Sequence, residues 1–149
     1  MSAAQPKTHI AIITAPYRRE IVDALYQGAV AQIEKTGATH ERIDVHGALE
    51  IAAVIAQLEA SQTASFDGYI GLGCILKGET IHDEVIAYTA FSSIDDMATN
   101  KLIAVGNGIL TVNTMDQAIE RSALDKQNRG AEAAKAAIRM LEIKRQHGN

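Results

Sequence analysis

The stretch LKGETIH, residues 76–82, follows an apolar run and combines groups suited to anion binding and proton transfer. Gly78 allows a ligand to approach the backbone, and the amides after it open a predicted helix whose positive end attracts phosphate. Lys77 adds positive charge, and the imidazole of His82 gains and loses protons near neutral pH. An ordinary helix start, with Thr80 as its cap and His82 half-exposed, explains the same residues. The stretch alone leaves both interpretations open.

Three further stretches carry groups that could bind a ligand, and each has an ordinary alternative. Glu50, in HGALE, could accept hydrogen bonds from ligand hydroxyls, or it is an acid favourably placed at a helix start. Tyr17, in APYRR, offers a face for stacking on a planar ligand, or it packs against the core. The last stretch, GNGILTVN (106–113), leads to Arg121 and Arg129, which are suited to binding phosphate, although surface arginines are usually only solvated.

An alternating pattern of strands and helices must position these stretches. Apolar periodicity predicts strands at 9–15, 41–45, 66–76 and 102–112, and helices over 18–35, from about 48 to 58, 82–99, 115–122 and 130–145. We expect the last strand to be broken or bulged at its two glycines. The helix over 82–99 is expected to bury Ala87, Phe91, Ile94 and Ala98.

Such alternation implies a parallel sheet with helices on both faces. Ligands bind these sheets beyond the carboxyl ends of the strands, which is where the four stretches fall. We therefore expect Tyr17, Glu50 and Arg121 to converge on one crevice, beside His82. The five histidines are scattered and the one cysteine has no nearby partner, so no metal site is indicated.

The composition bounds the class of protein. The 149 residues are 47% hydrophobic and 21% charged, as is typical of a globular chain. A net charge of −4 argues against nucleic acid as a partner, and no apolar run is long enough for a membrane helix. The amino terminus has no apolar signal segment and Cys74 cannot form an internal disulfide, so we expect a cytoplasmic location. One domain over 9–149, after a flexible segment 1–8, is expected.

Four segments follow one another at compatible spacing: GALEI (47–51), GCILKGETIH (73–82), GNGILTVNTMDQAIER (106–121) and NRGAEAAKAAIRM (128–140). Together they resemble the lumazine synthase family, over about residues 9 to 145. The resemblance implies a flavodoxin-like, three-layer α/β/α sandwich with a four-stranded parallel sheet. It also implies a transferase of riboflavin biosynthesis that needs no metal or organic cofactor. This enzyme condenses 5-amino-6-ribitylamino-pyrimidinedione with 3,4-dihydroxy-2-butanone 4-phosphate to give 6,7-dimethyl-8-ribityllumazine, phosphate and water.

The resemblance also assigns roles to residues of this chain. His82 matches the histidine thought to shuttle protons, and Arg121 matches the arginine that binds the substrate phosphate. Glu50 matches the acid that holds the ribityl chain, and Tyr17 the aromatic residue that stacks on the pyrimidine ring. The other implied substrate-binding residues are Ala48 and Leu49 beside that acid, Ile75 and Leu76 at the ring, Gly78, Glu79 and Thr80 at the phosphate, Asn107 from a neighbouring subunit, and Arg129.

Family members form pentamers whose active sites lie between adjacent subunits, so the implied partners are small-molecule substrates and further copies of the chain. Some residues depart from the family pattern. His46 and Ala52 replace prolines, Asp83 replaces an aromatic residue, and Arg129 stands where many members have lysine. These departures leave a second hypothesis open, in which the chain is a catalytically weak homologue that binds lumazine or flavin, or serves as an assembly scaffold.

Overall fold

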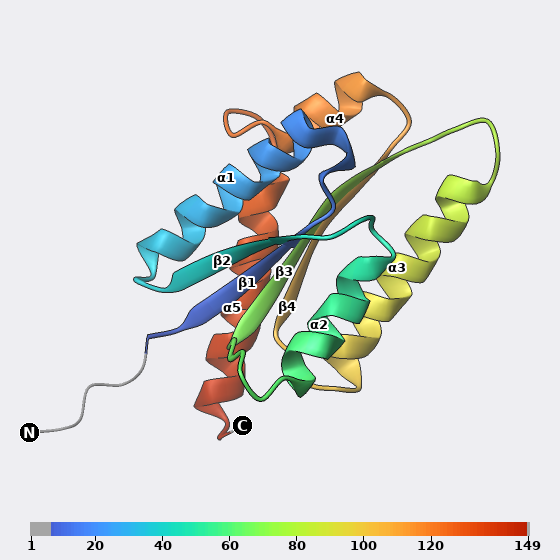
Figure 1. Ribbon diagram of the computed structural model, residues 1–149. Helices are drawn as coiled ribbons and strands as arrows, with labels where there is room; N and C mark the ends of the chain where they lie inside the picture. Colours follow the sequence, from blue (N-terminus) through green and yellow to red (C-terminus); the bar gives the residue numbers. More distant parts are fainter. Residues whose placement is uncertain (1–6, 149) are drawn as a thin grey trace, which may run out of the picture.

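Four parallel strands form one sheet, in the order β2-β1-β3-β4, in the computed structural model, which describes residues 7–148 (Figure 1). Most of the expected flexible segment 1–8 lies outside the described residues. No helix within the described range combines the length and apolarity needed to cross a membrane. The strands are β1 (His9–Thr14), β2 (Thr39–Asp44), β3 (Gly68–Leu76) and β4 (Val105–Val112).

Five helices cover the two faces of the sheet and complete the three-layer sandwich that the sequence predicts (Figure 1). A short 3-10 turn, Pro16–Arg18, precedes the first of them. α1, α4 and α5 lie on one face, and α2 and α3 lie on the other. Their bounds are α1 (Arg19–Lys35), α2 (Glu50–Ala60), α3 (His82–Thr99), α4 (Met115–Ser122) and α5 (Arg129–Gln146).

Each face of the sheet has its own apolar core because successive strand residues point to opposite faces. Ile10 and Ile12 of β1 belong to the core beneath α1, α4 and α5, whereas Ala11 and Ile13 belong to the core beneath α2 and α3. All four side chains are at most 1% exposed. β1 is therefore buried on both faces, as is usual in a parallel sheet.

Two sequence-based expectations about the elements are wrong in detail. β4 runs without a break through Gly106 and Gly108, whose Cα atoms stay in register with β3, so the expected bulge is not formed. Phe91 does not lie on the inner side of α3, because that helix buries Ala90 and Ile94 and leaves Phe91 38% exposed.

Close packing of α5, rather than a bulge, accounts for the glycine in β4. A β-carbon at Gly106 would lie 1.9 Å from the carbonyl oxygen of Ala133 in α5. A β-carbon at Gly130 of α5 would lie 1.9 Å from the carbonyl oxygen of Leu25 in α1. Most of the alanines of α5 are buried at these contacts, so this alanine-rich helix packs on its own sheet and on α1.

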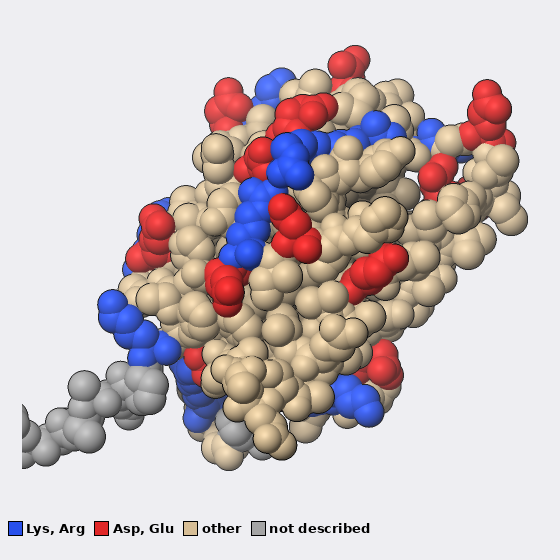
Figure 2. Space-filling view, viewed as in Figure 1, with Lys and Arg blue, Asp and Glu red and all other residues tan. Residues whose placement is uncertain are grey.

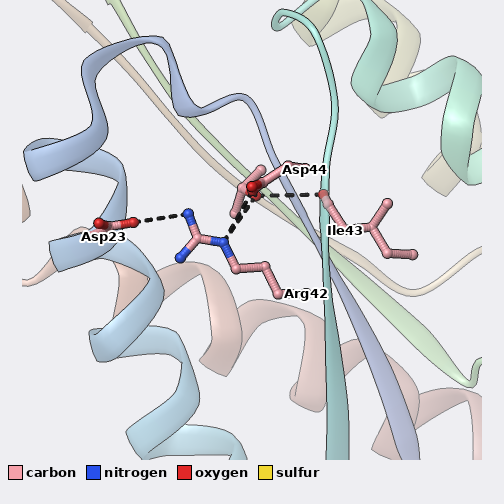
Figure 3. A network of polar contacts seen from close by, with 5 residues as sticks. Asp23, Arg42, Ile43 and Asp44 are labelled. Carbon is pink, nitrogen blue, oxygen red and sulfur yellow. Dashed lines mark hydrogen bonds and ion pairs between the residues drawn. The ribbon is translucent and has the colours of Figure 1, made fainter.

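A polar network joins β1, β2 and α1 near the ends of the two strands (Figure 3). Arg42 of β2 donates from Nη2 to the Asp23 carboxylate of α1 at 2.8 Å, and from Nε to the Asp44 carboxylate at 3.1 Å. The buried Thr14 hydroxyl also donates to Asp44, and the Arg42 guanidinium carbon lies 4.6 Å from the centre of the Tyr26 ring. The network therefore fixes the two strand ends from which the next loops continue.

Replacing Gly130 by alanine tests the close approach of α1 and α5. The added β-carbon meets the Leu25 carbonyl oxygen, so the helices must separate, and we expect the free energy of unfolding to fall by about 1–3 kcal/mol. Urea unfolding of the purified variant measures this loss. Ala136→Ser, at an exposed position of the same helix, is the control and should cost less than about 0.5 kcal/mol. Equal stability of the two variants would contradict the packing described.

Asp44→Asn tests the polar network through its dependence on pH. Hydrogen bonding from Thr14, together with the charge and hydrogen bond of Arg42, holds the pKa of Asp44 below its ordinary value of 3.8. Because the folded-state pKa is lowered, the stabilisation is complete above the ordinary carboxyl pKa and is lost as pH falls through the lowered value.

We therefore expect Asp44→Asn to be less stable than wild type at pH 7, by under about 1 kcal/mol because the Asp44 side chain is 46% exposed. The difference in the free energy of unfolding between the variant and wild type should become smaller as pH falls from about 5 to about 2. Urea unfolding midpoints of both proteins across this range measure that difference. Asp125→Asn, in the exposed turn before α5, is the control. A stability difference that is independent of pH would rule out the ionised carboxylate as its source.

Candidate active site

A pocket of about 560 Å³ opens at the carboxyl ends of β1, β2 and β3. The strand order reverses at β1 and β3, since β2 lies on one side of this pair and β4 on the other. Loops that leave such a reversal point in opposite directions create a crevice beyond the strand ends. The predicted site residues that line the pocket are Tyr17, Ala48, Leu49, Glu50, Ile75, Leu76, Gly78 and His82.

The last part of β3 forms the floor of this pocket. Thr14, at the end of β1, pairs with Leu72, whereas 73–76 continue beyond β1 and pair with β4. One edge of this segment therefore has no strand partner within the described chain, and its backbone groups face the crevice. Ile75 and Leu76 add half-buried apolar side chains. Such a floor suits a planar heterocycle that has amide-like groups along its edge.

Tyr17 and Glu50 enter the pocket from two different loops. Tyr17 follows β1 and is 83% exposed, so packing in the core does not explain its position. Glu50 is the first residue of α2, and its carboxylate folds toward Gly47, where a β-carbon would lie 3.3 Å from Oε2. A stacking face and a hydrogen-bond acceptor thus stand on separate walls of the same crevice.

The loop between β3 and α3 forms the remaining wall. The Asp83 carboxylate accepts a hydrogen bond from the Gly78 amide. The Thr80 hydroxyl accepts one from the His82 amide at 3.2 Å and so satisfies one donor at the helix start, but the N-cap residue is Ile81 and not Thr80 as expected. The His82 side chain is exposed and lines the pocket. Glu79 and Thr80 are exposed on the loop and do not line it.

A second hollow, of about 300 Å³, runs along β4 between α3 and α5. Asn107, Arg121 and Arg129 line it, together with the exposed Phe91. β4 is an edge strand, and the side-chain oxygen of Asn107 accepts a hydrogen bond from the Ile109 amide at 2.9 Å on that edge.

The arginines of this hollow are held only lightly by their own chain. Arg121 donates to the Gln117 carbonyl oxygen at 3.3 Å, and Arg129 donates to the Gln127 side chain at 3.2 Å. Neither bond is to an acidic side chain. Both guanidinium groups therefore keep donors that an anionic ligand can use.

The expectation that Arg121 converges with Tyr17 and Glu50 is not met within one chain. Tyr17 and Glu50 follow β1 and β2, whereas Arg121 follows the outer strand β4, whose connection leads away from the crevice. Apart from Glu79 and Thr80, which line neither, the predicted site residues are therefore divided between two separate cavities.

Arg18, Cys74 and Asp83 also line the main pocket, although they are not among the predicted site residues. Nε of Arg18 is buried and has no hydrogen-bond partner among the described residues, and its guanidinium carbon lies 5.7 Å from the centre of the Tyr17 ring. Its place directly after a strand end is a signal that the sequence does contain. Burial raises the pKa of the Cys74 thiol, which disfavours the thiolate that a nucleophile needs.

The β3–α3 loop and the first turn of α3 carry more acidic than basic side chains, although Asp83 is the one acid among them that lines the pocket. Figure 2 shows charges of both signs interspersed on one face, with acidic side chains gathered over this loop at the upper right. The loop and the first turn of α3 carry Glu79, Asp83 and Glu84 against Lys77. A phosphate bound here would therefore need additional positive charge from outside the loop.

Comparisons with known proteins agree with the resemblance seen in the sequence. The profile of the 6,7-dimethyl-8-ribityllumazine synthase family matches residues 7–145. A protein of that name from Bartonella tribocorum is 42% identical over 149 residues, which cover 100% of this chain and 98% of the relative. A Rhodopseudomonas palustris protein, named 6,7-dimethyl-8-ribityllumazine synthase 1, is 41% identical over 139 residues, or 91% of this chain and 85% of the relative. With matches that extend over nearly its whole length, the chain belongs to the 6,7-dimethyl-8-ribityllumazine synthase family.

Proposed function

We propose that this chain is an enzyme of riboflavin biosynthesis that makes 6,7-dimethyl-8-ribityllumazine from the ribitylamino-pyrimidinedione and the butanone phosphate. The observation that carries the proposal is the meeting of Tyr17, Glu50 and His82 in one pocket of a chain that belongs to this family. We place the reaction in the cytoplasm and assign it to one domain over 9–149. The alternative, a scaffold with little activity, is not favoured, because the relatives carry the name of the enzyme.

We assign the main pocket to the larger substrate. We propose that the pyrimidinedione ring stacks on Tyr17 and meets the free backbone edge of β3 beside Ile75 and Leu76. The ribityl chain then extends toward Ala48, Leu49 and Glu50, where the carboxylate accepts hydrogen bonds from its hydroxyls. In this arrangement the ring and the ribityl chain of the substrate each bind to a different wall of the crevice.

Proton transfer is the task that we assign to His82. Attack of the substrate amine on the ketone carbon, followed by loss of water, forms a Schiff base. Elimination of phosphate follows, and closure of the second ring then releases a second molecule of water. Each of these steps moves protons. An exposed imidazole at the pocket wall can accept and return them. Holding two substrates in contact supplies much of the remaining rate, which is the role of the pocket walls.

We further propose that the active site is completed by a neighbouring subunit in a homopentamer. The acidic loop at Gly78, Glu79 and Thr80 needs positive charge for a phosphate, and Arg121 and Arg129 lie in a separate hollow of the same chain. Placing the hollow of one subunit against the pocket of the next brings these groups together, with Asn107 beside them. Exposed apolar side chains on and beside α3, at Ile81 (70%), Val85 (52%) and Tyr88 (75%), support burial of that helix against another subunit.

A turnover assay tests the proposed reaction directly. Purified protein is mixed with both substrates, and the absorbance of the lumazine product is followed against the slow uncatalysed condensation. Clear acceleration is expected. A rate no higher than the background would refute the proposed activity and leave binding as the remaining role.

His82→Ala tests the proton carrier. Removing the imidazole should lower kcat by about 100-fold or more, because it removes a general acid–base group, while thermal unfolding stays close to that of wild type. His147→Ala, at the exposed carboxyl end of the chain, is the matched control and should keep full activity. Loss of activity in both variants would point to a general effect on folding instead.

Co-expression of two impaired variants, assayed at a butanone phosphate concentration too low for Arg121→Ala to turn over, tests the shared site. Arg121→Ala alone should mainly raise KM for the phosphorylated substrate, and His82→Ala alone should lower kcat. If each site takes His82 from one subunit and Arg121 from the next, mixed rings should contain about one quarter intact sites and regain a corresponding share of activity. A site formed within one subunit would regain none, and a monomer in native mass measurement would exclude the shared site altogether.

A further inference from the structure

The Asp83 side chain closes onto the loop that precedes its own helix. Its carboxylate accepts the hydrogen bond of the Gly78 amide, and a β-carbon at Gly78 would lie 2.7 Å from Asp83 Oδ2. Asp83 is half-buried in the first turn of α3, and both residues line the 560 Å³ pocket. The amide at the glycine turn is thus already occupied by an anionic oxygen of the protein itself.

A carboxylate and a phosphate use the same donors. Backbone N–H groups at a glycine turn before a helix bind either anion, and each amide has only one hydrogen to donate. A phosphate that takes the Gly78 amide must therefore displace the Asp83 carboxylate. If the carboxylate remains close by, the two negative charges repel each other at short range.

We infer that Asp83 competes with the substrate phosphate for the Gly78 amide and thereby sets the affinity of the pocket for the phosphorylated substrate. This inference rests on the proposed function only in naming that substrate, because the competition itself concerns any phosphate group. Asp83 acts as a specificity-determining residue that weakens phosphate binding in the absence of a further cation.

The surroundings of Asp83 strengthen this competition. Glu79 and Glu84 add negative charge on the same loop and helix turn, and Lys77 is the one lysine or arginine within 77–84. Arg18 and Lys77 line the same pocket and offset part of this charge, whereas Arg121 and Arg129 line the other hollow. The same repulsion acts on inorganic phosphate after the reaction, so Asp83 also favours release of that product.

A different role for the same hydrogen bond is to hold the loop in place, and two variants separate the roles. Asp83→Asn removes the charge but keeps an oxygen that can accept from Gly78. Asp83→Ala removes both. If Asp83 competes with phosphate, both variants should bind phosphate more tightly than wild type. If Asp83 only holds the loop in place, Asp83→Asn should bind phosphate as wild type does, and Asp83→Ala should bind it more weakly. Glu84→Gln, which removes a neighbouring charge outside the pocket lining, is the matched control.

Calorimetric titration of the full-length protein with inorganic phosphate, in phosphate-free buffer, measures the effect without any turnover. We expect Asp83→Asn to bind phosphate about fivefold to tenfold more tightly than wild type, and Glu84→Gln to change the affinity by less than about twofold. In the turnover assay, KM for the butanone phosphate should fall in Asp83→Asn while KM for the pyrimidinedione stays constant.

The two measurements keep the inference distinct from the proposed function. Tighter phosphate binding in Asp83→Asn without lumazine formation would support the competition and refute the proposed enzyme. Lumazine formation with phosphate affinity unchanged or weakened in Asp83→Asn would overturn the competition and leave the enzyme intact. No phosphate binding by any of the variants would also overturn it.

Discussion

Parallel pairing of β1 with both of its neighbours is the constraint on which the rest of this chain depends. Every strand must return to the same end of the sheet through a helix, so all strand ends gather at one edge and both faces of β1 are covered. The connection after β1 leads to β2 on one side, and the connection after β3 leads to β4 on the other, so these two loops diverge. The crevice between them is thus a result of the strand order and does not depend on the side chains that line it.

The sequence predicts the elements well because their apolar periodicity is strong, and the departures have physical causes. Periodicity does not fix which of two adjacent stripes of α3 turns inward, and Phe91 lies on the outer one. The sequence predicts α5 but not how closely its backbone packs on β4. The glycines of β4 therefore suggested a bulge, whereas Gly106 makes room for the Ala133 carbonyl oxygen of α5.

The sequence predicts part of the candidate site but not all of it. Residues between a strand end and the start of the next helix, such as Tyr17 and Glu50, were predicted to face the crevice, and they do. The position of Arg121 was not predictable, because the order of strands in the sheet decides on which side the last connection leaves. The hydrogen bond between Asp83 and Gly78 was also not predictable from the sequence, because it depends on how the loop folds back on the helix.

The hydrogen bond between the Asn107 side chain and the Ile109 amide has a consequence for how copies of the chain can meet. It occupies a backbone donor on the open edge of β4, where a further strand would otherwise add. Another chain cannot continue the sheet at this point without first breaking that bond. Contact at this point of the β4 edge is thereby directed to side chains and helices rather than to an added strand.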